Sequence, residues 1–208
     1  MIVYLADKSD FLEDVDSNRI EERILAEFKR TNRRSVGQAE INSWRNSMGF
    51  MQRIVNDDEI PTDTGVAIEF GIPQTEKRID FILTGRNSEN RPSAIIIELK
   101  QWTEARLTNK DGVVNTVLGG ARIETPHPSY QAWSYSALLE DFSEPVRNQN
   151  MSLNPCAYLH NCADESVIRA PFYAAHLERA PAFLSDDAAK LRAFIKQHVK
   201  RGDSGALI

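Results

Sequence analysis

Apolar residues recur at helical spacing through the first third of the chain. Residues 19–30 carry them three or four positions apart, which predicts an amphipathic helix. Asn18 followed three residues later by Glu21 has the form of a capping box at its start. A second row of apolar residues at helical spacing predicts another helix. It would begin with a capping box at Ser35 and Gln38 and end before Pro61. The apolar residues of the two helices are Ile20, Ile24, Leu25 and Phe28, then Ile41, Trp44, Met48, Met51 and Val55.

The hydrophobic pattern then changes to that of strands. Residues 65–72 and 77–83 are short β-rich runs, and the turn residues 73–76 between them predict a hairpin. Residues 93–100 (SAIIIELK) contain an unbroken apolar run, which is typical of a central strand buried on both faces. Residues 103–125 are polar and contain three glycines, so we expect a long flexible loop there.

The second half of the chain returns to helices around one more strand. The pattern predicts a helix over residues 128–142, a strand over 154–159 and further helices up to residue 200. Asp186 or Asp187 would cap the last helix, whose core residues would be Leu191, Phe194, Ile195 and Val199. The order α-α-β-β-β-α-β-α-α predicts an α/β fold with a mixed sheet between helices.

Length and composition fit one domain. The 208 residues are 41% hydrophobic and 26% charged, which excludes disordered, collagen-like and disulfide-scaffold classes. We expect a single domain over residues 1–200, with a helical part at 10–58, a catalytic core at 65–160 and C-terminal helices at 164–200. Residues 201–208 are polar and glycine-rich, and we expect them to be a linker toward a further domain.

Charge and cysteine content restrict the partners and the compartment. No apolar run approaches the ~18 residues that a membrane span requires, and the N-terminus lacks the basic and apolar regions of a signal peptide. We therefore expect a cytoplasmic chain with no membrane partner. Cys156 and Cys162 are expected to be reduced core thiols, because one such pair with His160 between them is a poor zinc site. The net charge of -5 means that binding of nucleic acid would need local basic patches or metal ions.

Charged residues interrupt two strands that otherwise read as buried. Asp80 lies inside one of them, and Glu98 and Lys100 end the other. Burying a lone charge is costly, so each acid needs an ion-pair partner or a metal. Glu98 and Lys100 share one strand face, where Asp80 of a neighbouring strand can meet them. Two carboxylates and a nearby backbone carbonyl suit Mg²⁺ or Mn²⁺, and a structural ion-pair cluster is the alternative.

These residues resemble a nuclease signature. Asp80, seventeen intervening residues and Glu98-Leu99-Lys100 are similar to the D-x(n)-(D/E)-x-K pattern of the PD-(D/E)xK nuclease superfamily. Arg78-Ile79-Asp80 stands where that family has Pro-Asp. Downstream, Gln131-x-x-x-Tyr135 is similar to the helix motif that follows the core in RecB-type nucleases.

The wider chain resembles the N-terminal domain of bacterial Schlafen-like nuclease-helicase proteins. The segments that carry this resemblance are MIVYLADKSDFL, INSWRNS, VAIEFGIPQTEKRIDFIL, IIIELKQW, HPSYQAWSYSALLEDF and PCAYLHN. It implies a restriction-endonuclease-like mixed sheet flanked by helices, metal-dependent hydrolysis of DNA with RNA left open, a superfamily 1 helicase in cis and defence against phage. No Gly-x-x-x-x-Gly-Lys-Ser/Thr occurs in these 208 residues, so helicase activity cannot belong to them. The alternative is a catalytically inactive nucleic-acid-binding or regulatory module that docks a helicase.

The resemblance also implies roles for single residues. Asp80 and Glu98 would hold one or two divalent ions, and Lys100 would orient the attacking water. By analogy with family members, an acid on the first helix completes the site. Glu21 is the best candidate, and its capping box is the competing explanation. Glu69 is a further candidate ligand, or else a solvated residue of a strand face.

Substrate contacts are expected mainly on the helix after the core. Gln131 and Tyr135 lie four positions apart on one helix face, where they could touch a phosphate or a base. An ordinary amphipathic face is the alternative. Arg78, beside Asp80, is another candidate for substrate binding. The weaker candidates are Lys29-Arg30 and Arg33-Arg34 at a helix end, His127 before a helix and Trp102 beside Lys100.

Overall fold

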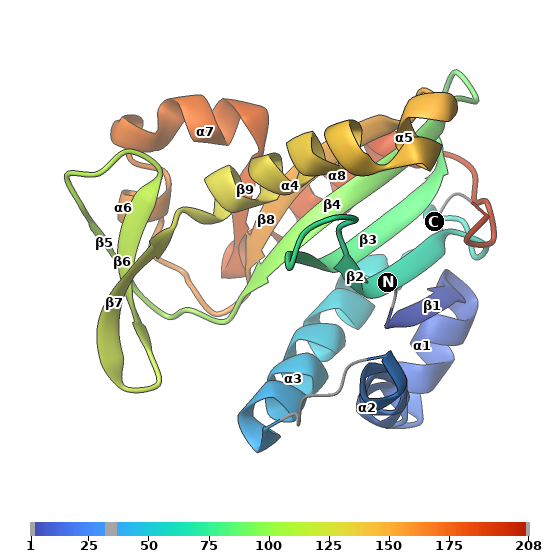
Figure 1. Cartoon of the computed structure of the whole chain (residues 1–208), viewed down its shortest axis with the longest axis horizontal. Helices are drawn as coiled ribbons and strands as arrows, with labels where there is room; N and C mark the ends of the chain where they lie inside the picture. The colour runs from blue at the N-terminus through green and yellow to red at the C-terminus, as the bar shows by residue number, and fades with distance from the viewer. Residues whose placement is uncertain (1–2, 32–36, 207–208) are drawn as a thin grey trace.

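A six-stranded mixed sheet organises the fold (Figure 1). The computed structural model describes residues 3–31 and 37–206. The strands lie in the order β1 (Tyr4–Asp7), β2 (Gly65–Gly71), β3 (Arg78–Arg86), β4 (Pro92–Lys100), β8 (Ser152–Leu159) and β9 (Ala182–Leu184). The pairs from β1 to β4 are antiparallel, whereas β4 with β8 and β8 with β9 are parallel. The predicted α/β fold with a mixed sheet is therefore confirmed.

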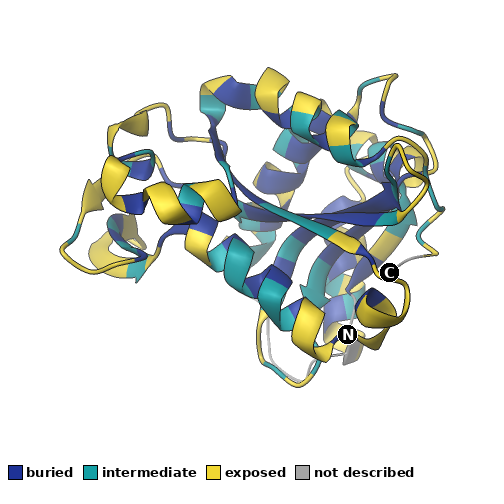
Figure 2. Ribbon diagram, turned by 90° about the horizontal axis from the view of Figure 1, so that it is seen from above, coloured by how far each residue is buried: buried dark blue, intermediate teal, exposed yellow. Residues whose placement is uncertain are grey.

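Helices cover both faces of this sheet, so that the strands are buried between them (Figure 2). One face carries α1 (Lys8–Asp16), α2 (Ile20–Thr31), α3 (Gln38–Val55) and α8 (Ala188–His198). The other face carries α4 (Pro128–Phe142) and α5 (Glu144–Asn148). The described chain also contains α6 (Glu165–Ile168), η1 (Pro171–Tyr173), α7 (Ala174–Arg179) and η2 (Ser185–Asp187). None of the helices in the described residues is long and apolar enough to span a bilayer.

β4 contributes side chains to the apolar cores on both faces of the sheet. Ile95 and Ile97 pack in the core beneath α3 and α8, whereas Ala94 and Ile96 pack beneath α4. All four side chains are at most 3% exposed. Alternate residues of a strand point to opposite faces, so this unbroken apolar run fits a strand covered on both sides, as the sequence predicted.

The prediction of a flexible loop over residues 103–125 is wrong. This segment forms a second antiparallel sheet of β5 (Ala105–Leu107), β6 (Val113–Leu118) and β7 (Ala121–Pro126). Gly119 and Gly120 have φ of 59° and 80°, which suits the two-residue turn that joins β6 to β7. Val114 and Thr116 point inward and are at most 1% exposed. The glycines therefore mark the turn of a hairpin. Its strands were missed because one of the two inward-facing residues, Thr116, is polar, so the alternation of apolar and polar residues is weak.

Several local predictions near element ends need correction. β1, α1 and β9 were not predicted, because each is short and has little periodicity. Asn18 has φ of 52°, whereas a helix cap requires extended backbone, so the capping box with Glu21 does not form. Ser35 and the pair Arg33-Arg34 lie outside the described residues. Asp187 does occupy the cap position of α8, but its carboxylate accepts from the Leu184 N–H and pairs with Arg169 instead.

The two cysteines and the end of the chain also have defined environments. Cys156 and Cys162 are buried free thiols, as predicted, and burial raises the pKa of both. Residues 201–206 pack on the sheet, which differs from the expected linker over 201–208. Arg201 bridges to Arg86 of β3, and the Asp203 carboxylate accepts from the N–H of Gly65 at 3.1 Å.

The contact between β3 and the C-terminal segment can be tested with a pair of glycines. A Cβ at Gly85 would lie 2.4 Å from the carbonyl oxygen of Arg201, so Gly85→Ala should destabilise the protein by about 1–3 kcal/mol. Gly49 in α3 has nothing within 4 Å of such a Cβ, so Gly49→Ala should stabilise by about 0.5–1 kcal/mol. Urea denaturation measures both. Equal stabilities of the two variants would contradict this packing.

Candidate functional site

The three residues predicted to be catalytic meet at one end of the sheet. The last pair that joins β3 to β4 is Phe81 with Ile97, so Asp80 and Glu98 come next on the two strands and face each other. The N–H of Leu99 donates to Asp80 Oδ2 at 2.8 Å. Lys100 Nζ lies 2.5 Å from Glu98 Oε1.

The sheet loses its regular alternation at the level of Asp80. Residues two apart in a strand normally share a face. Ile68 and Phe81 belong to the core beneath α3, yet Phe70 and Ile79, two positions away on their strands, pack toward α4. Between Ile68 and Phe70 lies Glu69, whose φ of 53° is left-handed and rare for a residue with a side chain. The distortion turns Glu69 toward α3, and it brings a second acid beside Asp80.

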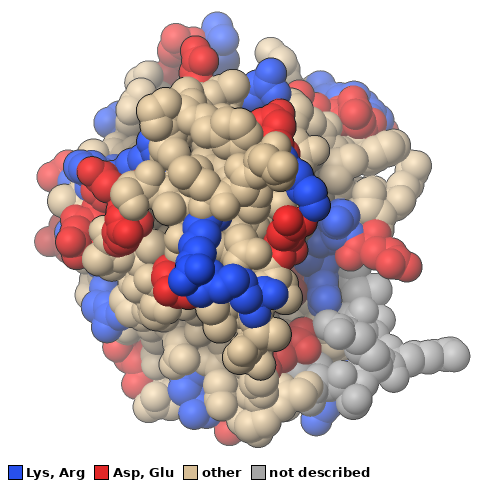
Figure 3. All heavy atoms as spheres, turned by 90° about the vertical axis from the view of Figure 1, so that its left-hand side faces the viewer, with Lys and Arg blue, Asp and Glu red and all other residues tan. Residues whose placement is uncertain are grey.

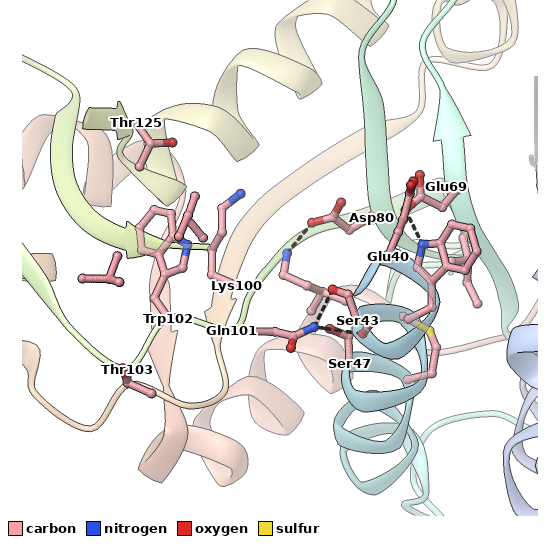
Figure 4. A pocket seen from close by; sticks show the side chains of 16 residues that line it. Glu40, Ser43, Ser47, Glu69, Asp80, Lys100, Gln101, Trp102, Thr103 and Thr125 are labelled. Atoms are coloured by element: carbon pink, nitrogen blue, oxygen red, sulfur yellow. Dashed lines mark hydrogen bonds between the residues drawn. The ribbon is translucent and has the colours of Figure 1, made fainter. Parts of the chain in front are cut away.

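A pocket of about 440 Å³ opens at this distorted end of the sheet. Its walls come from α3, from the ends of β2, β3 and β4, and from the β6–β7 hairpin. Figure 4 shows Lys100 and Asp80 between α3 on one side and the chain leading to the small sheet on the other. The charged side chains in the lining are Glu40, Glu69, Asp80 and Lys100. Three acids and one ammonium thus share one pocket.

Glu98 lies behind this pocket and is only 1% exposed. Its Oε1 accepts from Lys100 and also from Gln131 Nε2 at 2.7 Å. Its Oε2 is buried and has no hydrogen-bond donor among the described residues. Burial and then the carboxylate of Asp80 raise the pKa of Glu98 to about 8. Glu98 therefore carries a proton at neutral pH unless a cation compensates its charge.

The charges of Asp80 and Lys100 depend on the same neighbours. Burial raises the pKa of Asp80, although Lys100 and the Leu99 N–H oppose that rise. Burial by itself would lower the pKa of Lys100, but the carboxylates of Glu98 and Asp80 outweigh it and raise the pKa. Lys100 is thus an ammonium that faces two acids. If both acids are ionised, one negative charge is not balanced by Lys100.

The donor set fits a hard divalent cation. Mg²⁺ is usually held by one or two carboxylates, while waters and substrate phosphates supply its other ligands. Asp80 and Glu98 provide two carboxylates, and Glu98 Oε2 is a buried oxygen to which no described residue donates. Within residues 3–31 and 37–206, no group of three or more His, Cys, Asp or Glu side chains is arranged to hold a metal. Two carboxylates are a ligand set that Mg²⁺ or Mn²⁺ could use if waters or phosphate oxygens completed its coordination.

Glu21 does not belong to the pocket, contrary to the expectation for an acid of the first helix. Its carboxylate lies 2.5 Å from Arg45 Nη2 of α3, so the side chain is used in an ion pair between two helices. The acid that a helix does contribute is Glu40, in the first turn of α3. Sequence reasoning missed it, although Glu40, Ser43 and Ser47 form a polar stripe at helical spacing beside the apolar seam.

Glu69 lines the pocket on the β2 side, and Arg78 is its ion-pair partner. Glu69 accepts from Trp44 Nε1 at 2.9 Å and lies 3.4 Å from Arg78 Nε. Burial and then Asp80 raise the pKa of Glu69 to about 6. Arg78 also stacks over the ring of Phe28, with 4.9 Å between its Cζ and the ring centroid. Arg78, which was predicted to bind substrate, therefore contacts Glu69 and Phe28 within the protein. Glu69 remains a candidate metal ligand.

Gln131 and Tyr135 point toward Glu98 from α4. The carboxamide of Gln131 donates to Glu98 and to the Tyr135 hydroxyl at 2.9 Å. Tyr135 is 7% exposed, and burial raises its pKa to about 12. The pair was expected to contact substrate; both residues line a depression along α4, and Gln131 also orients the buried carboxylate.

The weaker candidates have structural roles where they are described. His127 is fully buried, accepts from the Ser129 N–H at the start of α4, and has its pKa lowered to about 4 by burial. Trp102 lines the pocket but is only 5% exposed. Arg30 pairs with Glu27 on the surface of α2.

Comparison with known proteins adds no relative to this picture. No family model, no curated protein and no solved structure matches the chain. The residues of the pocket are therefore the basis for assigning a function.

The raised pKa of Glu98 makes a prediction about stability in metal-free buffer. Because the folded pKa of about 8 lies above the ordinary 4.5, Glu98 favours folding at low pH and loses that contribution as the pH rises through 8. Glu98→Gln keeps an acceptor for Lys100 and cannot ionise. It should exceed the wild type by at least about 1 kcal/mol at pH 8.5 and match it near pH 4.5.

Urea denaturation in EDTA at the two pH values measures this difference. The matched control is Glu178→Gln, at an exposed position of α7, which should show no such pH dependence. If Glu98→Gln is instead less stable than the wild type at pH 8.5, the cluster is a stabilising structural ion pair.

Proposed function

We propose that this chain is a divalent-metal-dependent nuclease domain of the restriction-endonuclease-like fold, which hydrolyses phosphodiester bonds in DNA. The observation that supports it is the convergence of Asp80, Glu98 and Lys100 at one end of a mixed sheet, beside an open pocket that Asp80 and Lys100 line. When Glu98 is ionised, its carboxylate and that of Asp80 face the single ammonium of Lys100, and a bound cation would compensate the remaining negative charge. The same three residues carry the resemblance to the PD-(D/E)xK signature.

Each residue has a distinct role in this proposal. Asp80 and Glu98 would hold Mg²⁺ or Mn²⁺, which when bound lowers the pKa of a water and neutralises charge on the scissile phosphate. Lys100 stays protonated and donates toward the attacking water or the phosphate oxygens. Gln131 holds Oε1 of Glu98 in place and leaves Oε2 free of donors. Glu40 and Glu69 are the acids that could hold a second ion.

The biological setting is proposed from the resemblance to nuclease-helicase proteins. The domain would work in the cytoplasm beside a superfamily 1 helicase in the same protein, in defence against phage. The net charge of -5 agrees with a domain that needs help to capture DNA. A helicase in cis would supply that capture by raising the local concentration of the strand. RNA is the other nucleic acid that the same chemistry could cut.

A catalytically inactive module that binds nucleic acid or docks a helicase is the second candidate. It is favoured by the small ligand set, because no third metal-binding side chain converges with the pair in the described residues. Loss of metal binding in such a module would leave the fold intact. Metal binding and cleavage by the same protein therefore separate the two candidates.

Cleavage of labelled DNA and RNA by the 208-residue chain tests the proposal. With Mg²⁺ or Mn²⁺ the wild type should cut and EDTA should stop it, while Asp80→Asn and Glu98→Gln should each lower the rate at least about 100-fold. Glu178→Gln serves as the exposed control. Metal should raise the Tm of the wild type and of the control but not of Asp80→Asn. Neither cleavage nor a metal-dependent Tm in the wild type would favour the inactive module.

Lys100→Ala should separate chemistry from metal binding. An ammonium cannot be a metal ligand, and its removal takes a positive charge from beside Glu98 and Asp80. We expect Mn²⁺ affinity, measured by calorimetry, to be equal or tighter, and single-turnover cleavage to fall by about 100-fold. Weaker Mn²⁺ binding in this variant would contradict the role given to Lys100.

A further inference from the structure

A second depression of about 660 Å³ continues from the catalytic pocket along α4. We call it the α4 groove. Lys100 and Thr125 line both hollows, so the two share a wall at the catalytic lysine. Tyr130, Trp133 and Lys77 are among the other residues that line the groove. A ligand that reaches Lys100 can therefore extend along the outer side of α4.

Two aromatic side chains of the groove are open to solvent. Tyr130 is 38% exposed and Trp133 is half-buried, and their ring centroids are 5.9 Å apart. Arg179 of α7 stacks over the indole of Trp133, with 4.4 Å between its Cζ and the ring centroid. This cation–π contact holds Trp133 in place on one side while the residue still lines the groove. The two rings, whose planes are tilted by 46° to each other, form a preformed aromatic surface beside the proposed cleavage site.

The cations near the groove differ in whether an acid pairs with them. Lys110 and Arg122 of the small sheet are paired with Glu124 and Glu104. Figure 3 shows that positive and negative side chains are interspersed on this side, with no broad basic area. Lys77 is exposed and forms no ion pair with any residue that the structure describes, so it is available for a phosphate.

The proposed catalytic residues lie below the surface, and this favours a single strand over a duplex as the substrate. Glu98 is 1% exposed, the Lys100 side chain is 16% exposed, and α3 and the β6–β7 hairpin wall the pocket. A duplex is stiff and derives its affinity mainly from phosphate contacts with a basic surface. A single strand is flexible enough to enter, and aromatic side chains bind it by stacking on its bases.

We propose that the α4 groove is a base-stacking subsite for single-stranded nucleic acid, with Trp133 and Tyr130 as the stacking surface and Lys77 near a phosphate. The inference rests on the proposed function, because the strand that it binds is the one that would be cut at Asp80 and Glu98. It also accounts for the aromatic residues of Tyr130-Gln131-Ala132-Trp133 that the catalytic cluster does not use.

Fluorescence anisotropy in EDTA tests the subsite without cleavage. The probes are labelled 12-nucleotide single-stranded DNA, single-stranded RNA and the matching DNA duplex. The wild type should bind at least one single strand about 10-fold more tightly than the duplex. The preferred strand then identifies the nucleic acid. Duplex binding as tight as that of both single strands overturns the proposal.

Variants on α4 assign the binding to the groove. Trp133→Ala and Tyr130→Ala should each weaken single-strand binding about 10-fold, and Trp133→Phe should restore most of the affinity. Phe142→Ala, at an exposed aromatic of the same helix outside the groove, is the matched control and should change nothing. The bound strand should quench the tryptophan fluorescence of the wild type, and this quenching should be lost in Trp133→Phe. A merely structural role of Trp133 would not produce that loss.

The outcomes separate this inference from the proposed function. Single-strand binding that depends on Trp133, in a protein that does not cut, supports the subsite and removes the nuclease activity. Metal-dependent cutting with binding that is unchanged in folded Trp133→Ala overturns the subsite and leaves the nuclease proposal standing.

Discussion

The burial of the Glu98 carboxyl is the constraint on which the site depends. A carboxyl with 1% exposure, placed opposite a second acid, can be ionised only beside positive charge. Lys100 supplies one charge from the same strand, two residues away, and Gln131 adds a donor from α4. Both donate to the same oxygen. The other oxygen has no donor among the described residues, so the cluster combines a low-dielectric setting with a carboxyl oxygen that could accept a cation.

Regular sheet geometry gives way where the acids meet. The left-handed backbone of Glu69 interrupts the alternation of β2, and β3 shifts at the same level, next to Asp80. Backbone strain of this kind persists only where surrounding packing holds it. Here Trp44 of α3 donates to Glu69 and fixes its new direction. The distortion therefore opens the pocket and lines it with carboxylates that a regular sheet would have separated.

α4 connects the catalytic cluster to the surface. Gln131 donates to Glu98 and to Tyr135, while Tyr130 and Trp133 line the groove together with that pair. A short stretch of sequence thus serves two purposes, positioning a buried acid and offering a stacking surface.

The sequence by itself determined β2, β3, β4 and β8 of the main sheet and the long helices, because their hydrophobic patterns are local. It also determined the cluster of Asp80, Glu98 and Lys100, because a charge inside an apolar strand is a local signal. The same local reasoning failed for Glu21, whose partner Arg45 lies 24 residues away, and for Gln131, which reaches Glu98 across 33 residues. It also missed Glu40 and the small sheet. Only the tertiary structure decided these, because packing between distant segments determines which polar group a side chain meets, and no periodicity along the chain records that distance.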